Sequence, residues 1–300
     1  MRTPIRQLPG KLFAHVRLRL RQVRNERDPV RFIASRLIWR SGAWRLLRIN
    51  LKFAEGFNIP FQPTSLSARY WIDRGHMVED RDFFRSYLRT GDVVVDVGAN
   101  IGVLSLTAAG VVGQRGRVIA IEPNERIFSF LAANVARNSP LEVSCLKSAV
   151  GSSAEILRMT DLRSDDFNAV IPDGQSLDGS VRTVQSNRLD DILGAVERVD
   201  LLKVDVEGFE LPVFNGAEKV LARTECIYFE CSRAHCRRYG YSPSDVVEYL
   251  ETQGFSLYRW SDHKAVPIAD VGTVGAVCEN LVAIRHAGAW EERTGAALAG

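Results

Sequence analysis

The sequence lacks the features that mark several classes of protein. Its 300 residues include only five cysteines, which are scattered and form no C-x-x-C pair, so neither a disulfide framework nor a cysteine zinc site is indicated. No run of about 18 apolar residues occurs, and the N-terminus has no uninterrupted signal-peptide core, so neither a membrane-spanning helix nor secretion is indicated. Internal repeats are also absent. We therefore expect a cytoplasmic globular protein with reduced, mostly buried thiols.

Acidic residues are nearly absent from the first 50 residues. That stretch has 13 Lys and Arg against two acids, Glu26 and Asp28, whereas residues 51–300 have 26 against 34. Asp28-Pro29 has the chemistry of a helix N-cap and first turn, and apolar residues then recur at helical spacing among the arginines. We expect residues 1–60 to form a basic, helical extension and residues 61–300 to form the main domain. The extension suits peripheral contact with an anionic inner membrane surface, or a solvated cap, better than it suits nucleic acid.

The most informative motif joins an apolar strand to a glycine turn. The run before Asp96 has the length and β-branched content of a buried parallel strand, Gly98 permits a tight turn, and Gly102 opens a helix. A second apolar strand, residues 118–121, then ends in Glu122. This is about the distance at which a βαβ nucleotide-binding unit places the carboxylate that accepts both ribose hydroxyls.

Two cofactors compete for this geometry, beside the alternative that the segment is only a turn. Dinucleotide enzymes use G-x-G-x-x-G, whose backbone approaches a pyrophosphate. Here the pattern is D-x-G-x-x-x-G, and a carboxylate two residues before the first glycine would repel a phosphate. The same carboxylate attracts a sulfonium and an amino-acid ammonium. The spacing therefore favours S-adenosylmethionine.

The body of the chain alternates strands with helices. A helix beginning at Ser242-Pro243 has Asp245 to complete a capping box and Gly254 to end it. The alternation predicts an open, doubly wound, mostly parallel α/β sheet, with ligands at the carboxyl ends of its strands. The expected strands are residues 93–96, 118–122, 141–150, 199–205, 226–230, 255–260 and 280–285, and the other expected helices are 81–89, 102–112, 126–138 and 189–195.

Several motifs together resemble the FkbM-type methyltransferases. They are the stretch Asp96–Gly102, Ile121-Glu122-Pro123-Asn124, Leu189-Asp190-Asp191 and the string Lys203–Glu210, within a resemblance that runs from about Glu79 to Ile284. The resemblance implies a class I, Rossmann-like fold and S-adenosylmethionine-dependent O-methylation of a hydroxyl on a sugar, a glycan or glycolipid, or a polyketide-type metabolite. It implies that the cofactor is bound by Asp96, Gly98, Ala99, Asn100, Gly102 and Glu122, with Ser148 and Ala149 near the adenine.

Acidic residues cluster where a base for the acceptor hydroxyl is expected. Asp205, Glu207 and Glu210 follow the strand 199–205, and Glu230 ends the strand 226–230. These four are our candidate catalytic residues, because methylating a hydroxyl of high pKa gains from a positioned base. Lys203 lies on the same strand face as Asp205 and is a candidate counter-ion. Asp205 and Glu207 also suit a divalent ion, because such ions prefer oxygen ligands. Glu207 and Glu210 suit helix capping as well.

Other interpretations stay open. His76 or His235 would also serve as the base, and the segment Asp165–Asn168 suits either an acceptor-site wall or a surface loop. Methylation of a nucleobase amine is disfavoured, because such enzymes usually carry an N/D-P-P-Y/F string where this chain has Asp205-Val206-Glu207-Gly208. A cofactor-binding protein that has lost catalysis would retain the same fold.

Overall fold

The fold is described from a computed structural model, over residues 26–161, 168–172, 174–175, 180–261, 263–296 and 298. The chain divides into two compact units, one comprising Met1–Leu51 and Pro60–His76 and the other comprising Lys52–Ile59 and Met77–Gly300. The expected boundary at residue 60 is therefore displaced, because Pro60–His76 groups with the N-terminal segment. No helix in the described ranges is long and apolar enough to cross a membrane.

The first unit is built on two helices. The carboxylate of Asp28 accepts a hydrogen bond from the Arg31 amide at 3.0 Å and Pro29 occupies the first turn, so the predicted N-cap is confirmed. Arg31 Nη1 donates to the carbonyl of Trp71 at 3.0 Å, which ties the two helices together. The elements are α2 (Pro29–Ser41), the 3₁₀ turn η1 (Ala43–Arg45) and α3 (Ser65–Ile72). The paired short strands β1 (Asn50–Lys52) and β2 (Asn58–Pro60) each include residues of both units.

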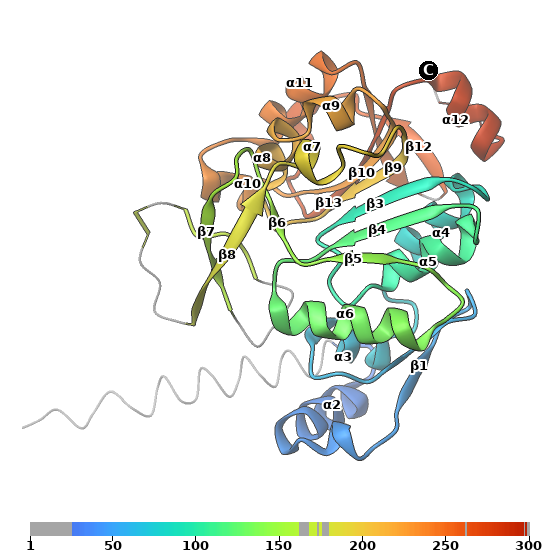
Figure 1. The fold of residues 1–300 in the computed structure, drawn as a ribbon, viewed down its shortest axis with the longest axis vertical. Coiled ribbons are helices and arrows are strands. Elements are labelled where there is room, and N and C mark those ends of the chain that lie inside the picture. The colour runs from blue at the N-terminus through green and yellow to red at the C-terminus, as the bar shows by residue number, and fades with distance from the viewer. Residues whose placement is uncertain are drawn as a thin grey trace, which may run out of the picture. The chain divides into compact units, whose positions relative to one another are not determined.

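The second unit contains an eight-stranded sheet in the order β12-β11-β13-β10-β9-β3-β4-β5 (Figure 1). β5, β4, β3, β9 and β10 run parallel, and β13, β11 and β12 continue the sheet antiparallel. The predicted open, mostly parallel α/β sheet is thus confirmed. The strands are β3 (Val93–Val97), β4 (Arg117–Ile121), β5 (Ser144–Leu146), β9 (Val199–Val204), β10 (Thr224–Cys231), β11 (Ser256–Ser261), β12 (Lys264–Pro267) and β13 (Glu279–Ile284).

Helices cover both faces of this sheet. One face carries α4 (Val78–Tyr87), α5 (Val103–Val112), α6 (Glu125–Arg137) and α12 (Ala287–Thr294), and the other carries α7 (Leu189–Ile192), α8 (Glu210–Asn215), α9 (Glu218–Leu221) and α11 (Pro243–Thr252). The short α10 (Arg233–Cys236) and η3 (Arg237–Tyr239) follow β10, and η4 (Val271–Thr273) precedes β13. The predicted capping box at Ser242 and Asp245 is present, with the Ser242 amide donating to Asp245 at 2.7 Å.

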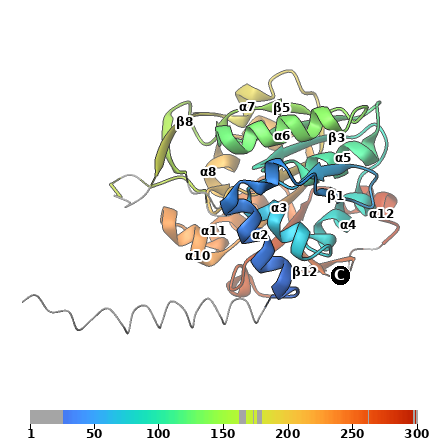
Figure 2. The ribbon, with the colours of Figure 1, turned by 90° about the horizontal axis from the view of Figure 1, so that it is seen from below.

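The expected strand 141–150 is instead two strands in different sheets. β5 ends at Leu146, the chain turns at the polar pair Lys147-Ser148, and β6 (Ala149–Val150) joins a second sheet of order β6-β8-β7. That sheet, with β7 (Ile156–Thr160) and β8 (Val181–Asn187), stands to one side of the large sheet, near α8 and away from α12 (Figures 1 and 2). Asp165, Asp166 and Phe167 lie outside the described residues.

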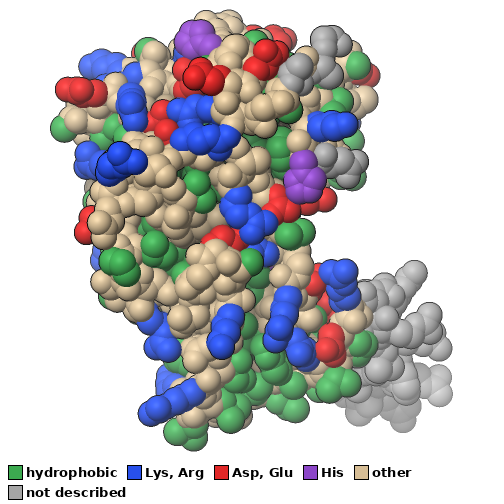
Figure 3. Space-filling view, turned by 90° about the vertical axis from the view of Figure 1, so that its right-hand side faces the viewer, with side chains coloured by type: hydrophobic (Ala, Val, Ile, Leu, Met, Phe, Trp, Pro, Cys, Tyr) green, Lys and Arg blue, Asp and Glu red, His purple; other side chains and the backbone are tan. Residues whose placement is uncertain are grey.

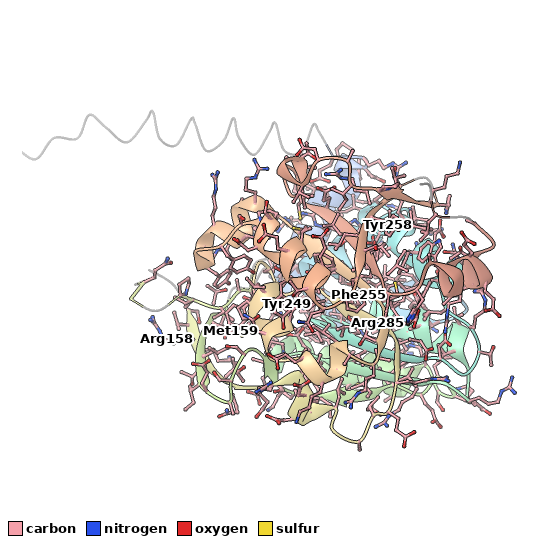
Figure 4. All side chains as sticks on the ribbon, turned by 90° about the horizontal axis from the view of Figure 1, so that it is seen from above. Arg158, Met159, Tyr249, Phe255, Tyr258 and Arg285 are labelled. Atoms are coloured by element: carbon pink, nitrogen blue, oxygen red, sulfur yellow. The ribbon has the colours of Figure 1, made fainter. Side chains whose placement is uncertain are left out.

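Arg285 ties the end of β13 to its neighbours. Its guanidinium lies 4.2 Å from the centre of the Phe255 ring, and both side chains are labelled in Figure 4. The same guanidinium donates to the carbonyls of Thr224, Gln253 and Leu221 at 2.6–2.9 Å. Because β13 is antiparallel to β10, this anchor lies at the amino ends of the parallel strands and leaves their carboxyl ends for the site.

Candidate functional site

The site lies where the strand order of the large sheet reverses, between the neighbouring strands β3 and β9. The turns that follow these two strands pack directly on one another. Gly98 has a φ of +79°, and a Cβ placed there would lie 1.9 Å from the Asp205 carbonyl oxygen. The Asp205 amide donates to the Val97 carbonyl at 3.1 Å. Gly98 is therefore required, because any side chain there would collide with the turn that begins at Asp205.

The turn after β3 uses its own backbone amides internally. Each amide from 98 to 102 donates to a protein oxygen: Gly98 and Ala99 to the Ile121 carbonyl at 2.9 and 3.0 Å, Asn100 to Glu122 Oε2 at 3.0 Å, Ile101 to Asn100 Oδ1 at 2.8 Å, and Gly102 to the Ala99 carbonyl at 2.9 Å. Asn134 on α6 supports this turn by donating to the Ile101 carbonyl at 2.9 Å. A turn without spare amides does not suit a pyrophosphate, which disfavours a dinucleotide.

Glu122 follows β4 and lies beside this turn. Its carboxylate is buried and accepts the amides of Asn100 at 3.0 Å and Asn124 at 2.8 Å. Burial raises the pKa of Glu122 to about 7, although these two amides act to lower it. A carboxylate has about four lone-pair positions, so two hydroxyl donors can bind in addition. This geometry suits the predicted contact with a ribose.

Asp96 is held from two sides beneath the turn. Ser105 Oγ donates to Asp96 Oδ2 at 2.5 Å, and Lys203 Nζ lies 3.1 Å from Asp96 Oδ1. Lys203 Nζ also donates to the Gly98 carbonyl at 2.8 Å. The Asp96 side chain is fully buried and fixes the turn, and its contact with the cofactor stays a prediction.

Lys203 also links Asp96 to Asp205, as strand alternation predicts. Its Nζ lies 3.5 Å from Asp205 Oδ2. Burial acts to lower the pKa of Lys203, but Asp96 and Asp205 outweigh it and raise that pKa, so the ammonium stays charged. Burial raises the pKa of Asp205 to about 6, against the opposing effect of Lys203. Asp205 is therefore an acid whose protonation changes close to neutral pH.

Three carboxylates and a histidine meet above β9 and β10. Oxygens of Asp205, Glu207 and Glu230 lie within 4.8 Å of one another, and ligand atoms of Glu230, His235 and Cys278 form a second such group. His235 Nδ1 lies 3.4 Å from Glu230 Oε2 and 3.6 Å from Glu207 Oε2. His235 and other nearby groups lower the pKa of Glu230, although burial opposes them. Both divalent-ion coordination and proton transfer are within the chemistry of this cluster.

Glu210 differs from the other predicted acids. Its Oε1 accepts the amides of Val206 at 3.2 Å and Gly208 at 3.0 Å, and the side chain is buried. Burial raises the pKa of Glu210 to about 8. Both amides precede α8, which has no side-chain cap hydrogen bond, so Glu210 holds the turn before that helix and does not match the helix-capping alternative. A Cβ on Gly208 would lie 2.7 Å from His235, so the turn also seats that histidine.

The remaining predicted residues lie elsewhere. Ser148 Oγ donates to the Ala149 carbonyl at 2.7 Å and accepts from Asn187 Nδ2 at 3.1 Å, where the chain passes from β5 to β6. Contact of Ser148 and Ala149 with an adenine stays a prediction. His76 belongs to the first unit, where its ring packs edge-on against Tyr70 at 5.2 Å.

Comparison with known proteins decides the family. The methyltransferase FkbM domain matches residues 96–257, a stretch that contains the turn after β3, Glu122 and the acidic cluster. The chain belongs to the FkbM methyltransferase family. Its cofactor is S-adenosylmethionine, and the site fits that group, because the Glu122 carboxylate keeps lone pairs for two hydroxyl donors and each amide of the turn already has a protein partner in place of a phosphate.

Two curated relatives of this FkbM protein match at similar levels. "Methyltransferase sdnD" of Sordaria araneosa is 31% identical over 163 residues, covering 44% of this chain and 62% of the relative. "Hexuronic acid methyltransferase AglP" of Haloferax volcanii is 30% identical over 161 residues, covering 53% of this chain and 61% of the relative. The chain thus spans about three fifths of the length of these relatives. A solved SAM-dependent methyltransferase from Aquifex aeolicus aligns with a TM-score of 0.41 at 19% identity, over 71% of this chain and 94% of that one.

The sequence indicated one member of this cluster, His235, only as an alternative and did not indicate another, Cys278. His235 was only an alternative base, because nothing in the sequence places it beside Glu230. Cys278 carried no signal, since it reaches the cluster only through the antiparallel pairing of β13 with β10, in which Glu230 opposes Asn280. Patterns within a single segment do not reveal such a contact.

Proposed function

We propose that this protein transfers the methyl group of S-adenosylmethionine to a hydroxyl oxygen of a sugar, a glycan or glycolipid, or a polyketide-type metabolite. The observation that carries the proposal is the position of Asp205, Glu207, Glu230 and His235 at the carboxyl ends of β9 and β10, next to the cofactor turn. An acceptor hydroxyl held there is close to proton-accepting groups. The hexuronic acid specificity of the Haloferax relative supports a sugar acid as the acceptor.

The cofactor half of the site has separate roles for its residues. When bound, S-adenosylmethionine supplies a methyl group on a sulfonium, and the bond from that carbon to sulfur breaks as the acceptor oxygen attacks. Glu122 accepts the ribose hydroxyls, and the Asn100 amide, which donates to Glu122 Oε2, keeps that carboxylate beside the turn. Asp96, through Ser105 and Lys203, holds this turn in position. The rigid turn lowers the barrier by orienting the reacting groups.

The acceptor half has to remove a proton. We assign that role to His235, oriented by Glu230. His235 Nδ1 and Glu230 Oε2 lie 3.4 Å apart without a hydrogen bond in this structure, and a small closure of this gap lets the carboxylate accept the Nδ1–H, fix the tautomer and leave Nε2 with a lone pair for the acceptor hydroxyl. The proton moves to Nε2 as the new bond from oxygen to carbon forms, so the products are the methyl ether and S-adenosylhomocysteine. Glu207 Oε2 lies 3.6 Å from His235 Nδ1 and places a second carboxylate beside the imidazole.

A divalent cation is the second use that these donors support. Asp205, Glu207 and Glu230 supply hard oxygen ligands of the kind that Mg²⁺ prefers. In that case the cation would bind the acceptor oxygen and lower its pKa, and His235 would not be the base. Activity that EDTA removes and Mg²⁺ restores would establish this use of the cluster.

A panel of acceptors tests the proposal. The full chain is incubated with S-adenosylmethionine and, separately, hexuronic acids, neutral sugars, hydroxylated polyketides and single-stranded nucleic acid, and release of S-adenosylhomocysteine is measured. With the wild type, we expect release in the presence of a hydroxylated acceptor. We expect the Glu230→Gln variant to bind S-adenosylhomocysteine as the wild type does but to turn over slowly. Release only with nucleic acid would refute the proposed acceptor class. Cofactor binding without turnover on any acceptor would favour a protein that has lost catalysis.

A further inference from the structure

Exposed apolar side chains gather on one part of the first unit. On α2, Val30, Ile33 and Leu37 are spaced three and four residues apart and therefore share a face of the helix. These three, with Leu46 and Leu47 just beyond η1, are between 46% and 85% exposed. The other large exposed apolar residues in the described ranges are dispersed along the second unit. Five such residues within 18 positions, three of them on one helix face, mark an interaction surface.

Positive charge surrounds the same face. Residues 29–54 contain no Asp or Glu, and Arg36, Arg40, Arg45 and Arg48 are all exposed. Within the described part of the chain, none of these four is ion-paired with a carboxylate. Figure 3 shows hydrophobic and basic side chains interspersed in its lower part. The surface is therefore both apolar and basic.

Aromatic rings hold two of these arginines. The Arg36 guanidinium lies 5.1 Å from the Phe32 ring centre, and the Arg45 guanidinium lies 4.7 Å from that of Trp44. Tryptophan beside arginine is the composition that prefers the headgroup level of a bilayer. Residues 1–25, which lie outside the described residues, add seven Lys and Arg and no acid to the sequence. Phosphate recognition alone would not require the apolar face.

We propose that α2 and the residues through Arg48 dock on an anionic lipid bilayer. The apolar side chains of the docking face, Val30, Ile33, Leu37, Leu46 and Leu47, enter the headgroup boundary, and the surrounding arginines bind lipid phosphates. The proposal concerns attachment to a surface, since no described helix is able to span a membrane. It is independent of the acceptor and of the chemistry proposed above.

Vesicle sedimentation of the full chain tests this docking face. Vesicles of phosphatidylcholine with phosphatidylglycerol are compared with vesicles of phosphatidylcholine alone, at low and high salt. We expect binding to the anionic vesicles that weakens as salt rises. An Arg36→Gln/Arg40→Gln variant should bind roughly 25-fold more weakly, from a factor of about five for each arginine. An Ile33→Asn/Leu37→Asn variant should lose at least about tenfold.

Matched variants on the second unit control for charge and polarity. Arg115→Gln/Arg117→Gln removes two exposed arginines, and Ile156→Asn/Val266→Asn makes two exposed apolar residues polar. Both should bind vesicles as the wild type does, and an unchanged melting temperature identifies each variant as folded. Equal binding to both kinds of vesicle, or loss of binding in the controls to the same extent, would overturn the proposal. Concentration-dependent self-association through Ile33 and Leu37 without lipid binding would overturn it in favour of a second copy of the chain.

Discussion

Replacing Glu122 by Gln tests two consequences of burying this carboxylate, one for protein stability and one for cofactor affinity. The side chain is buried against the turn after β3, and burial raises its pKa from 4.5 to about 7. Because the pKa of Glu122 is higher in the folded state, the protonated side chain favours folding. This contribution to the free energy of unfolding is fully present below the pKa of the unfolded chain and is lost as pH rises through about 7. Above that pH the folded protein bears the cost of a buried charge.

The magnitude follows from the size of the shift. Each pKa unit corresponds to about 1.4 kcal/mol, so the shift from 4.5 to about 7 corresponds to roughly 3 kcal/mol. Because Gln does not ionise, the free energy of unfolding of Glu122→Gln should rise relative to that of the wild type by about 3 kcal/mol between pH 5 and pH 8. Urea denaturation at several pH values measures this difference, with the exposed Glu142→Gln as the control for loss of a carboxylate.

Cofactor affinity should change in the opposite direction. An ionised Glu122 accepts hydrogen bonds from both ribose hydroxyls, so wild-type affinity for S-adenosylhomocysteine should increase as pH rises through about 7. The Gln variant should bind about 100-fold more weakly at pH 8, or roughly 3 kcal/mol, with little pH dependence. Titration calorimetry measures both. A stability difference that stays constant from pH 5 to pH 8 would refute the buried charge, and equal affinities would refute the ribose contact.

Three further variants test other parts of the site. Gly98→Ala should lower the free energy of unfolding by about 3 kcal/mol or more, because its Cβ would lie 1.9 Å from a carbonyl oxygen. The control is Gly240→Ala, which also has a positive φ but has open space around it, and it should lower the free energy of unfolding by only about 1–2 kcal/mol. Glu210→Ala should be less stable than Glu210→Gln in urea by about 1–3 kcal/mol, because Gln keeps an oxygen for the two turn amides. His235→Ala should bind S-adenosylhomocysteine as the wild type does but lower kcat at saturating S-adenosylmethionine by about 100-fold or more, and an unchanged kcat would exclude His235 as the base.

Local patterns predicted the centre of the site because strand and turn chemistry is short-range. The apolar run before Asp96 formed β3, and the carboxylate at the end of the next strand lies against the turn. Alternation along β9 placed Lys203 beside Asp205, as the ion pair at 3.5 Å shows. These features depend on periodicity and on the glycine conformations that a tight turn requires.

Contacts between distant segments were the part that sequence did not reveal. The strand 141–150 divided at Lys147-Ser148 because each half pairs with a different sheet, a choice that tertiary structure makes. Glu210 shares a run with Asp205, yet its burial turns it toward backbone amides. His235 lies beside Glu230 only because the chain turns back over the sheet through α10.

A crystal structure of the full chain with S-adenosylhomocysteine tests the central claim most directly. The account predicts one bound molecule at the carboxyl ends of β3 and β9, with its ribose hydroxyls on Glu122 and its sulfur facing the cluster of Asp205, Glu230 and His235. A ligand bound elsewhere on the sheet, or one whose ribose makes no contact with Glu122, would contradict it.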